Sequence, residues 1–84
     1  MHVVELSQEA QKFLEKLDVH VRERIERRLR MLGESPVPSD AKFIDRDEVG
    51  QKVFRIRIGG FRALYKVIDK NQVVLVAKID SRPH

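Results

Sequence analysis

The stretch VFRIRIGGFRALYKV, residues 53–67, decides the fold of this chain. It consists of two alternating runs of apolar and polar residues on either side of Gly59 and Gly60. Successive side chains of a strand point to opposite faces of a sheet, and a Gly-Gly pair between two such runs is typical of a two-residue hairpin turn. The stretch therefore predicts an antiparallel hairpin. Its cross-strand pairs are expected to be Ile58 with Phe61, Arg57 with Arg62, Ile56 with Ala63, and Phe54 with Tyr65.

One face of this hairpin is apolar, and the other carries Arg55, Arg57 and Arg62. Like charges directly opposite one another destabilise a sheet, so the pairing of Arg57 with Arg62 calls for a compensating gain. A bound anion would supply it, because a guanidinium group presents a planar fork of donors that suits phosphate. The alternative is a solvated strand face that uses arginine for its long stem. The residues alone leave both interpretations open.

Length, charge and cysteine content limit the class of protein. The 84 residues are expected to form one domain, residues 1–84, with a net charge of +4 and a pI of about 9.8. A basic chain favours a polyanionic partner such as a nucleic acid, but does not identify one. The lack of cysteine excludes disulfides and agrees with a reducing, cytoplasmic setting. No apolar run reaches membrane-span length and no acidic or histidine spacing predicts a metal site, so we expect no membrane association, metal or other cofactor.

Two amphipathic helices are predicted before the hairpin. Ser7 is a good N-cap for a helix over residues 8–17. Asp18 caps a second helix over residues 19–32, and Gly33 is expected to be its C-terminal cap. Each helix has a single apolar stripe, so the two should form an antiparallel hairpin that packs on a sheet. The stripes are Ala10, Phe13, Leu14 and Leu17 in the first helix and Val21, Ile25, Leu29 and Leu32 in the second.

The second helix is strongly basic. A solvated helix face explains this most simply, whereas a second phosphate-binding surface for a large RNA is the functional alternative. The arginines concerned are Arg22, Arg24, Arg27, Arg28 and Arg30.

Shorter segments complete the predicted sheet. Residues 2–6 are a β-rich run and read as a first strand. The two prolines of residues 34–40 indicate a loop, residues 41–44 fit a short edge strand, and residues 45–51 read as a turn. The fold class is therefore α+β, with the helical hairpin on one face of a mainly antiparallel sheet of four to five strands.

The last strand, residues 73–80, is placed by its pattern. A three-residue loop over residues 70–72 would give the sheet a wholly apolar inner face. The inward side chains of the strand would then be Val73, Leu75, Ala77 and Ile79.

The outer face would then combine charged and apolar side chains. Lys78 is expected beside Leu64, and Asp80 opposite Arg62. An exposed apolar group on the same face is usually covered by a partner. The apolar group predicted there is Leu64, Ile68, Val74 and Val76.

The order of elements, together with the motif R-I-R-I-G-x-F-R-x-x-Y in residues 55–65, resembles the RelE/ParE superfamily of small toxins from type II toxin–antitoxin modules. The resemblance covers nearly the whole chain. It implies a partner antitoxin and a toxin–antitoxin hetero-oligomer. In the RelE branch it implies a ribosome-dependent endoribonuclease, an mRNA interferase that cuts mRNA in the ribosomal A site, neutralised by a RelB-like antitoxin.

Roles in the RelE branch can be carried over position by position. The counterparts of its working residues are Arg55 and Arg57 before the turn, Arg62 after it, and Arg82 after the last strand. The family often has a terminal tyrosine where this sequence ends at His84, and that difference affects the catalytic step more than RNA binding. Further RNA contacts are expected from Lys52 and Lys78, and antitoxin contacts from Leu64, Ile68, Val74 and Val76.

The chemistry of RNA cleavage agrees with these roles only in part. Arginine stays protonated, so it stabilises a charged phosphorane well and serves poorly as a base. His84 has an ordinary pKa near ~6.5, which suits proton transfer, whereas His2 and His20 are expected at the surface. Two alternatives therefore remain. One is a ParE-like inhibitor of gyrase, and the other is a degenerate toxin that binds RNA without cutting it.

Overall fold

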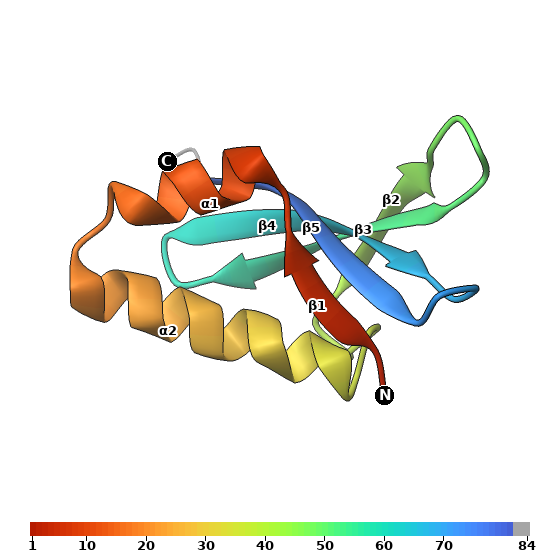
Figure 1. Cartoon of the computed structure of the whole chain (residues 1–84), viewed down its shortest axis with the longest axis horizontal. Coiled ribbons are helices and arrows are strands. Elements are labelled where there is room, and N and C mark those ends of the chain that lie inside the picture. The colour runs from red at the N-terminus through yellow and green to blue at the C-terminus, as the bar shows by residue number, and fades with distance from the viewer. Residues whose placement is uncertain (82–84) are drawn as a thin grey trace.

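Two helices pack against one face of a five-stranded sheet in the computed structural model of the chain, which describes residues 1–81 (Figure 1). The elements are β1 (Val3–Leu6), α1 (Gln8–Glu15), α2 (Val19–Arg30), the 3-10 turn η1 (Met31–Gly33), β2 (Lys42–Arg46), β3 (Lys52–Ile58), β4 (Phe61–Ile68) and β5 (Val73–Ser81). The strand order is β1-β5-β4-β3-β2, in which β1 is parallel to β5 and all other neighbours are antiparallel. The predicted α+β class is confirmed.

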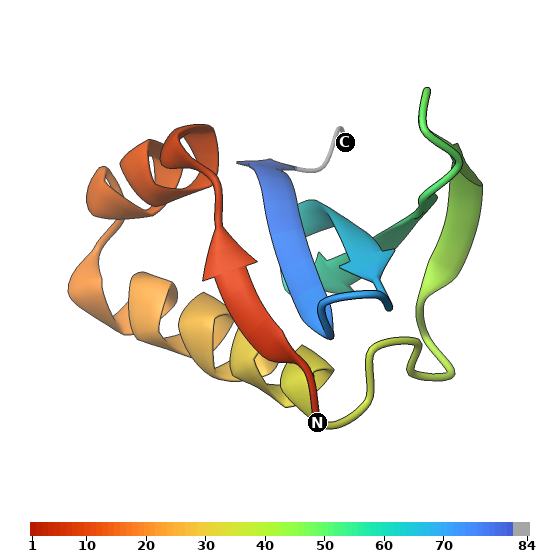
Figure 2. The same cartoon turned by 45° about the vertical axis from the view of Figure 1, so that its right-hand side comes forward.

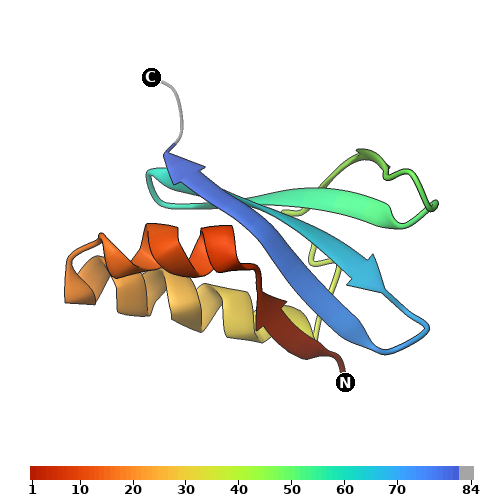
Figure 3. The ribbon, with the colours of Figure 1, turned by 45° about the horizontal axis from the view of Figure 1, so that its top comes forward.

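Both helices lie on the same side of the sheet, as Figures 2 and 3 show. We call the face toward the helices the inner face and the opposite one the outer face. Within residues 1–81 no helix covers the outer face. The same part of the chain contains no helix long and apolar enough to cross a membrane.

The helices begin where the sequence predicts. The Ser7 hydroxyl accepts a hydrogen bond from the Ala10 amide at 3.0 Å, and the Asp18 carboxylate accepts one from the His20 amide at 2.9 Å. These caps satisfy amide groups that the first helical turn leaves without partners. The first helix ends two residues earlier than predicted, and the second tightens into η1 for its last turn.

Gly33 has a different role from the one predicted. It does not adopt the positive φ of a glycine cap and is instead buried beside the first strand. A Cβ atom at Gly33 would lie 2.7 Å from the carbonyl oxygen of His2, and the His2 amide donates to the Gly33 carbonyl at 2.7 Å. Glycine is therefore required here by close backbone contact.

The core lies between the helices and the inner face of the sheet. Phe54 stacks on Tyr65 with ring centroids 5.7 Å apart, and Tyr65 is fully buried. Its hydroxyl donates to the Pro36 carbonyl at 2.8 Å, which fixes the loop between η1 and β2. The other buried apolar residues are Ala10, Leu14, Ile25, Leu29, Leu32, Ile56, Ile58, Ala63, Val74, Val76 and Ile79.

The central hairpin has the predicted register, including Arg57 opposite Arg62 and Phe54 opposite Tyr65. Its turn has a positive φ, 61°, at Gly59, whereas Gly60 lies outside the positive region. A positive φ at the first central residue alone is the pattern of a type II′ turn.

The register of β5 is confirmed in one half and wrong in the other. Asp80 lies opposite Arg62 and Lys78 lies beside Leu64 as predicted, but Val76 lies opposite Tyr65, where the predicted three-residue loop would place Ala77. The loop between β4 and β5 has four residues, not three, and a β-bulge at Ala77 compensates for the extra residue.

Two residues predicted to face outward therefore belong to the core. Val74 and Val76 are fully buried on the inner face, and cannot form an antitoxin-binding surface. Val73 and Leu75, predicted to be internal, point outward instead because side chains alternate along the strand.

The edge strand β2 runs two residues beyond the predicted segment, and all five of its side chains are exposed. Asp47 organises the turn that follows, since its carboxylate accepts from the amides of Val49 and Gln51 and from the Lys66 ammonium group. These hydrogen bonds, with that from Lys66 the strongest, hold the pKa of Asp47 below its usual value.

Candidate nucleic-acid interface

Two cross-strand rows bring basic side chains together on the outer face. In one row, Lys42 pairs with Arg55, Arg55 with Leu64, and Leu64 with Lys78. In the adjacent row, Arg57 pairs with Arg62 and Arg62 with Asp80. We call the five cations of these rows the basic cluster: Lys42, Arg55, Arg57, Arg62 and Lys78.

The predicted repulsion between Arg57 and Arg62 is partly relieved by Asp80. The Arg62 Nε donates to Asp80 Oδ1 at 2.7 Å, and both side chains are about one-third exposed. This ion pair fixes the direction of the Arg62 guanidinium group. Among residues 1–81 the other four cations of the cluster have no ion-pair partner, which leaves them available to an anion.

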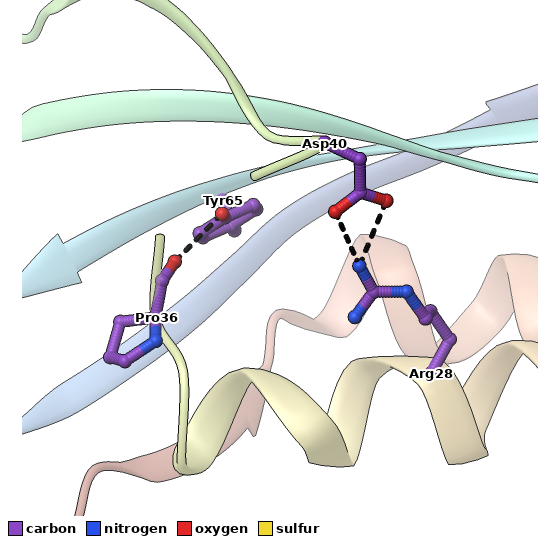
Figure 4. Close-up of polar contacts among 4 residues, drawn as sticks. All are labelled: Arg28, Pro36, Asp40 and Tyr65. Carbon is purple, nitrogen blue, oxygen red and sulfur yellow. Dashed lines mark hydrogen bonds and ion pairs between the residues drawn. The ribbon is translucent and has the colours of Figure 1, made fainter. Parts of the chain in front are cut away.

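A shallow hollow of about 360 Å³ lies at the β2 side of the cluster, lined by Asp40, Lys42, Arg55 and Arg57. Asp40 is turned toward the helix layer. Both of its carboxylate oxygens accept from Nη2 of Arg28 in α2, at 2.8 and 2.9 Å (Figure 4). The hydrogen bonds from Arg28 hold the pKa of Asp40 below its usual value, so the carboxylate is charged at neutral pH.

The structure separates Lys52 from this cluster. In the β3 register Lys52 lies on the face of Phe54, opposite to the face that presents Arg55. It lines a different groove of about 520 Å³, whose floor includes Phe54 and Val67. The alternation of residues 52–58 in the sequence already indicates that Lys52 shares the face of Phe54 and not that of Arg55. Lys42, in contrast, was missed because its position depends on how the edge strand pairs.

The histidines within the described residues lie elsewhere. His2 contacts Asp69 at 3.3 Å, and His20 lies in the first turn of α2. Arg82 and His84, predicted to take part in catalysis, lie outside the described residues. Within residues 1–81 no group of acidic or histidine side chains could hold a metal ion. The described cluster can therefore bind phosphate and stabilise negative charge, but it supplies no histidine for proton transfer.

Two arginines of α2 reach the edge of the sheet, although the helix itself lies on the inner face. Arg28 reaches Asp40 as described, and Nη2 of Arg24 would lie 3.0 Å from a Cβ at Gly59, so its guanidinium group sits beside the β3–β4 turn. Arg27 and Arg30 are exposed, which agrees with a solvated helix face.

The far end of the outer face is apolar. Val3 pairs with Val73, and Val73 with Ile68, so these side chains form a row across three strands. Leu75 lies in the next row, between Glu5 and Lys66. We call Val3, Ile68, Val73 and Leu75 the apolar patch. Leu64, predicted to belong with it, lies instead between Arg55 and Lys78 in the basic cluster.

Comparison with known proteins identifies relatives along the whole chain. A family model described as the ParE toxin of type II toxin–antitoxin systems, parDE, matches residues 4–83. Comparison with curated protein sequences gives no significant match.

Three solved structures resemble the fold closely. The chain is 23% identical to a protein of the archaeal RelE–RelB complex from Pyrococcus horikoshii OT3, with a TM-score of 0.86 over 99% of this chain and 97% of that one. It is 26% identical to the isolated E. coli RelE toxin, with a TM-score of 0.78 over 100% and 87% of the two chains. It is 24% identical to a chain of the RelBE2 toxin–antitoxin complex from Mycobacterium tuberculosis, with a TM-score of 0.79 over 96% and 91%.

Proposed function

Since the chain belongs to the RelE/ParE superfamily of toxins from type II toxin–antitoxin systems, we propose that it inhibits translation by binding messenger RNA on the ribosome and promoting its cleavage. The observation that carries this proposal is the basic cluster on the outer face. Phosphate contacts provide most of the affinity of a protein for nucleic acid, and arginine is suited to them.

The charge balance of the cluster favours an RNA strand. Its five cations face one carboxylate in the same two rows, that of Asp80, and Asp80 is occupied by Arg62. Asp40, at the rim, is occupied by Arg28. Within these two rows phosphates would therefore meet Lys42, Arg55, Arg57 and Lys78 without a competing free carboxylate, and the exposed Asp45 lies in the next row, opposite Val53.

Cleavage would proceed by attack of a ribose 2′-oxygen on the adjacent phosphorus, with departure of the 5′-oxygen. Arg55 and Arg57 would stabilise the added negative charge of the phosphorane, because guanidinium donors strengthen as charge develops. The 2′-hydroxyl must lose a proton and the 5′-oxygen must gain one. His84 is proposed for this proton transfer, and Arg82 for a further phosphate contact, in line with the family resemblance.

An antitoxin is the proposed protein partner. Two of the similar structures are RelE–RelB and RelBE2 complexes, in which the toxin is bound to an antitoxin. In this chain the apolar patch, together with Leu64 beside it, offers half-buried and exposed apolar side chains that a partner would cover. A RelB-like antitoxin seated there would border the basic cluster through Leu64 and so restrict access of RNA.

Gyrase is the second candidate target. The matching family model is that of ParE toxins, and the described part of the cluster has no histidine to move a proton. A toxin that inhibits its target by binding alone, without catalysing a reaction, would need only the charged surface of the basic cluster.

The test measures mRNA cleavage in a reconstituted translation system, with and without ribosomes, alongside a gyrase supercoiling assay. Arg55→Ala/Arg57→Ala should abolish cleavage and lower the salt dependence of RNA binding, by about 0.7 in slope for each lost phosphate contact. Lys12→Ala/Lys16→Ala removes two exposed charges from the α1 region and serves as the control.

If the protein inhibits gyrase and leaves mRNA intact, gyrase and not messenger RNA is its target. RNA binding without cleavage would identify a degenerate toxin. Wild-type cleavage by the Arg55→Ala/Arg57→Ala variant would overturn the role of the cluster.

A further inference from the structure

Asp40 is an anion placed beside a proposed anion-binding site. It lines the same hollow as Lys42, Arg55 and Arg57. Asp40 also comes two residues before Lys42, which pairs with Arg55, so it lies alongside the Arg57 end of β3. Its side chain is 54% exposed and can therefore change direction at small cost. A carboxylate with such neighbours would compete with phosphate for the three cations.

Arg28 prevents this competition in the structure. Its Nη2 donates to both oxygens of Asp40, at 2.8 and 2.9 Å, and it reaches them from α2 on the helix side (Figure 4). The Arg28 side chain is 23% exposed and thus held more firmly than its partner.

We infer that Arg28 is a positioning residue of the basic cluster, which holds the Asp40 carboxylate toward the helices and so leaves Lys42, Arg55 and Arg57 free for phosphate oxygens. This inference rests on the proposed binding of RNA at that surface. It assigns a function to one arginine of α2 without requiring that the helix itself touch the nucleic acid.

A purely structural role for the pair is the competing explanation. The Arg28–Asp40 contact also joins α2 to the loop before β2. That loop has a second, independent anchor in the hydrogen bond from Tyr65 to the Pro36 carbonyl, at 2.8 Å (Figure 4). Partly exposed ion pairs contribute little to stability, so the loop should keep its place when the pair is broken.

The experiment measures binding of a fluorescein-labelled single-stranded RNA by anisotropy across a series of salt concentrations. Arg28→Gln should weaken binding about three- to tenfold and reduce the salt slope, because a freed carboxylate neutralises a phosphate-binding cation. Asp40→Asn should bind at least as well as wild type. The double variant Arg28→Gln/Asp40→Asn should regain the affinity of Asp40→Asn, since no carboxylate remains to be released.

The matched control is Arg27→Gln, which removes the same charge from the adjacent, exposed position of α2. It should leave affinity within about twofold of wild type, because long-range charge effects at an exposed site are largely screened by salt. If the double variant stays as weak as Arg28→Gln, Arg28 acts through structure or through its own contact with RNA, and the inference is overturned.

A second measurement separates this inference from the proposed function. Side-chain Nε resonances of Arg55 and Arg57 should shift in Arg28→Gln and return in the double variant, whether or not RNA binds. Unmoved resonances would overturn the inference even if the cluster binds RNA. Shifted resonances in a protein that does not bind RNA would uphold the repositioning of Asp40 and reject the proposed function instead.

Discussion

At the scale of single residues, Arg62 shows how the chain accommodates an unfavourable local arrangement. It lies directly opposite Arg57 in the hairpin, and it is also paired with Asp80 on the other side. Like charges that face one another cost stability, whereas a partly exposed ion pair contributes only about 0–1 kcal/mol. The two effects nearly cancel, so stability alone gives little reason for an arginine at this position.

Replacing Arg62 with alanine should therefore change the free energy of unfolding by no more than about 1 kcal/mol. Under the proposed function, the same change should abolish mRNA cleavage, because Arg62 belongs to the basic cluster and its ion pair with Asp80 engages only Nε, which leaves the Nη groups for a phosphate. Urea denaturation and the cleavage assay on one protein preparation check both parts. Asp80→Asn serves as the control, because it breaks the ion pair but keeps the Arg62 charge. A loss of several kcal/mol in Arg62→Ala would show that the arginine is structural.

Tyr65 gives a pH-dependent prediction at the same scale. Burial raises its pKa to about 12, from the ordinary value of 10.0. The neutral phenol is thus favoured in the folded state, and the resulting stability is fully present below pH 10 and lost as the pH rises toward about 12. The sequence has one tyrosine and no tryptophan, so the ultraviolet absorbance of phenolate reports this group alone.

The expected result is a phenolate transition near pH 12 in the folded protein and near 10 in concentrated urea. Tyr65→Phe should lack both transitions. It should also lose about 1–3 kcal/mol of stability, because the Pro36 carbonyl loses its hydrogen-bond donor. A folded-state transition near pH 10 would mean that the tyrosine is accessible to water.

At the scale of elements, the bulge in β5 is coupled to the start of α1 through one serine. The Ser7 hydroxyl accepts from the Ala10 amide at 3.0 Å and donates to the Ala77 carbonyl at 2.7 Å. The Ser7 amide also donates to the Val76 carbonyl at 2.9 Å. A helix cap and an irregular point of the sheet therefore share a single side chain.

Ser7→Ala should accordingly be more harmful than loss of an ordinary cap. We expect about 1 kcal/mol from the cap and a further 1–3 kcal/mol from the Ala77 carbonyl left without its donor. Asp18→Ala is the matched control, since Asp18 caps α2 by a local bond to His20. It should cost only about 1 kcal/mol in denaturant unfolding. Equal losses in the two variants would show that the contact with Ala77 contributes nothing.

The same bulge marks the point in β5 beyond which the predicted register is wrong. Residues 54–58 alternate strictly, and residues 61–67 do so except at Leu64, so their register followed from that alternation. Residues 73–77 read VVLVA and are apolar on both faces, so their pattern cannot select which side faces inward. The register of residues 73–77 depends on the length of the β4–β5 loop and on the Ser7 hydroxyl, which donates to the Ala77 carbonyl. The basic cluster was predictable where alternation held, and Lys42 was missed because edge-strand pairing depends on the preceding loop.

At the scale of the whole molecule, the outer face is divided into two regions. The basic cluster lies toward the β3–β4 turn, and the apolar patch toward the β4–β5 loop, on strands that run through both. Ser81 pairs with Phe61, so β5 ends beside the cluster. One rigid sheet thus holds a proposed RNA-binding surface next to a proposed partner surface, with Leu64 at the boundary.

Neighbouring residues of β5 provide the strictest test of this division. Leu75 is half-buried on the outer face, whereas Val74 is fully buried on the inner face. Leu75→Asp should fold, with a loss of about 1–2 kcal/mol, and should fail to assemble with the cognate antitoxin in co-expression, because it places a charge in the apolar patch. Val74→Asp should unfold the protein, since an unpaired charge would be buried among the helices. Circular dichroism and co-purification measure both results. If Leu75→Asp and a second patch variant, Ile68→Asp, both form a complex of wild-type stability, the antitoxin binds elsewhere.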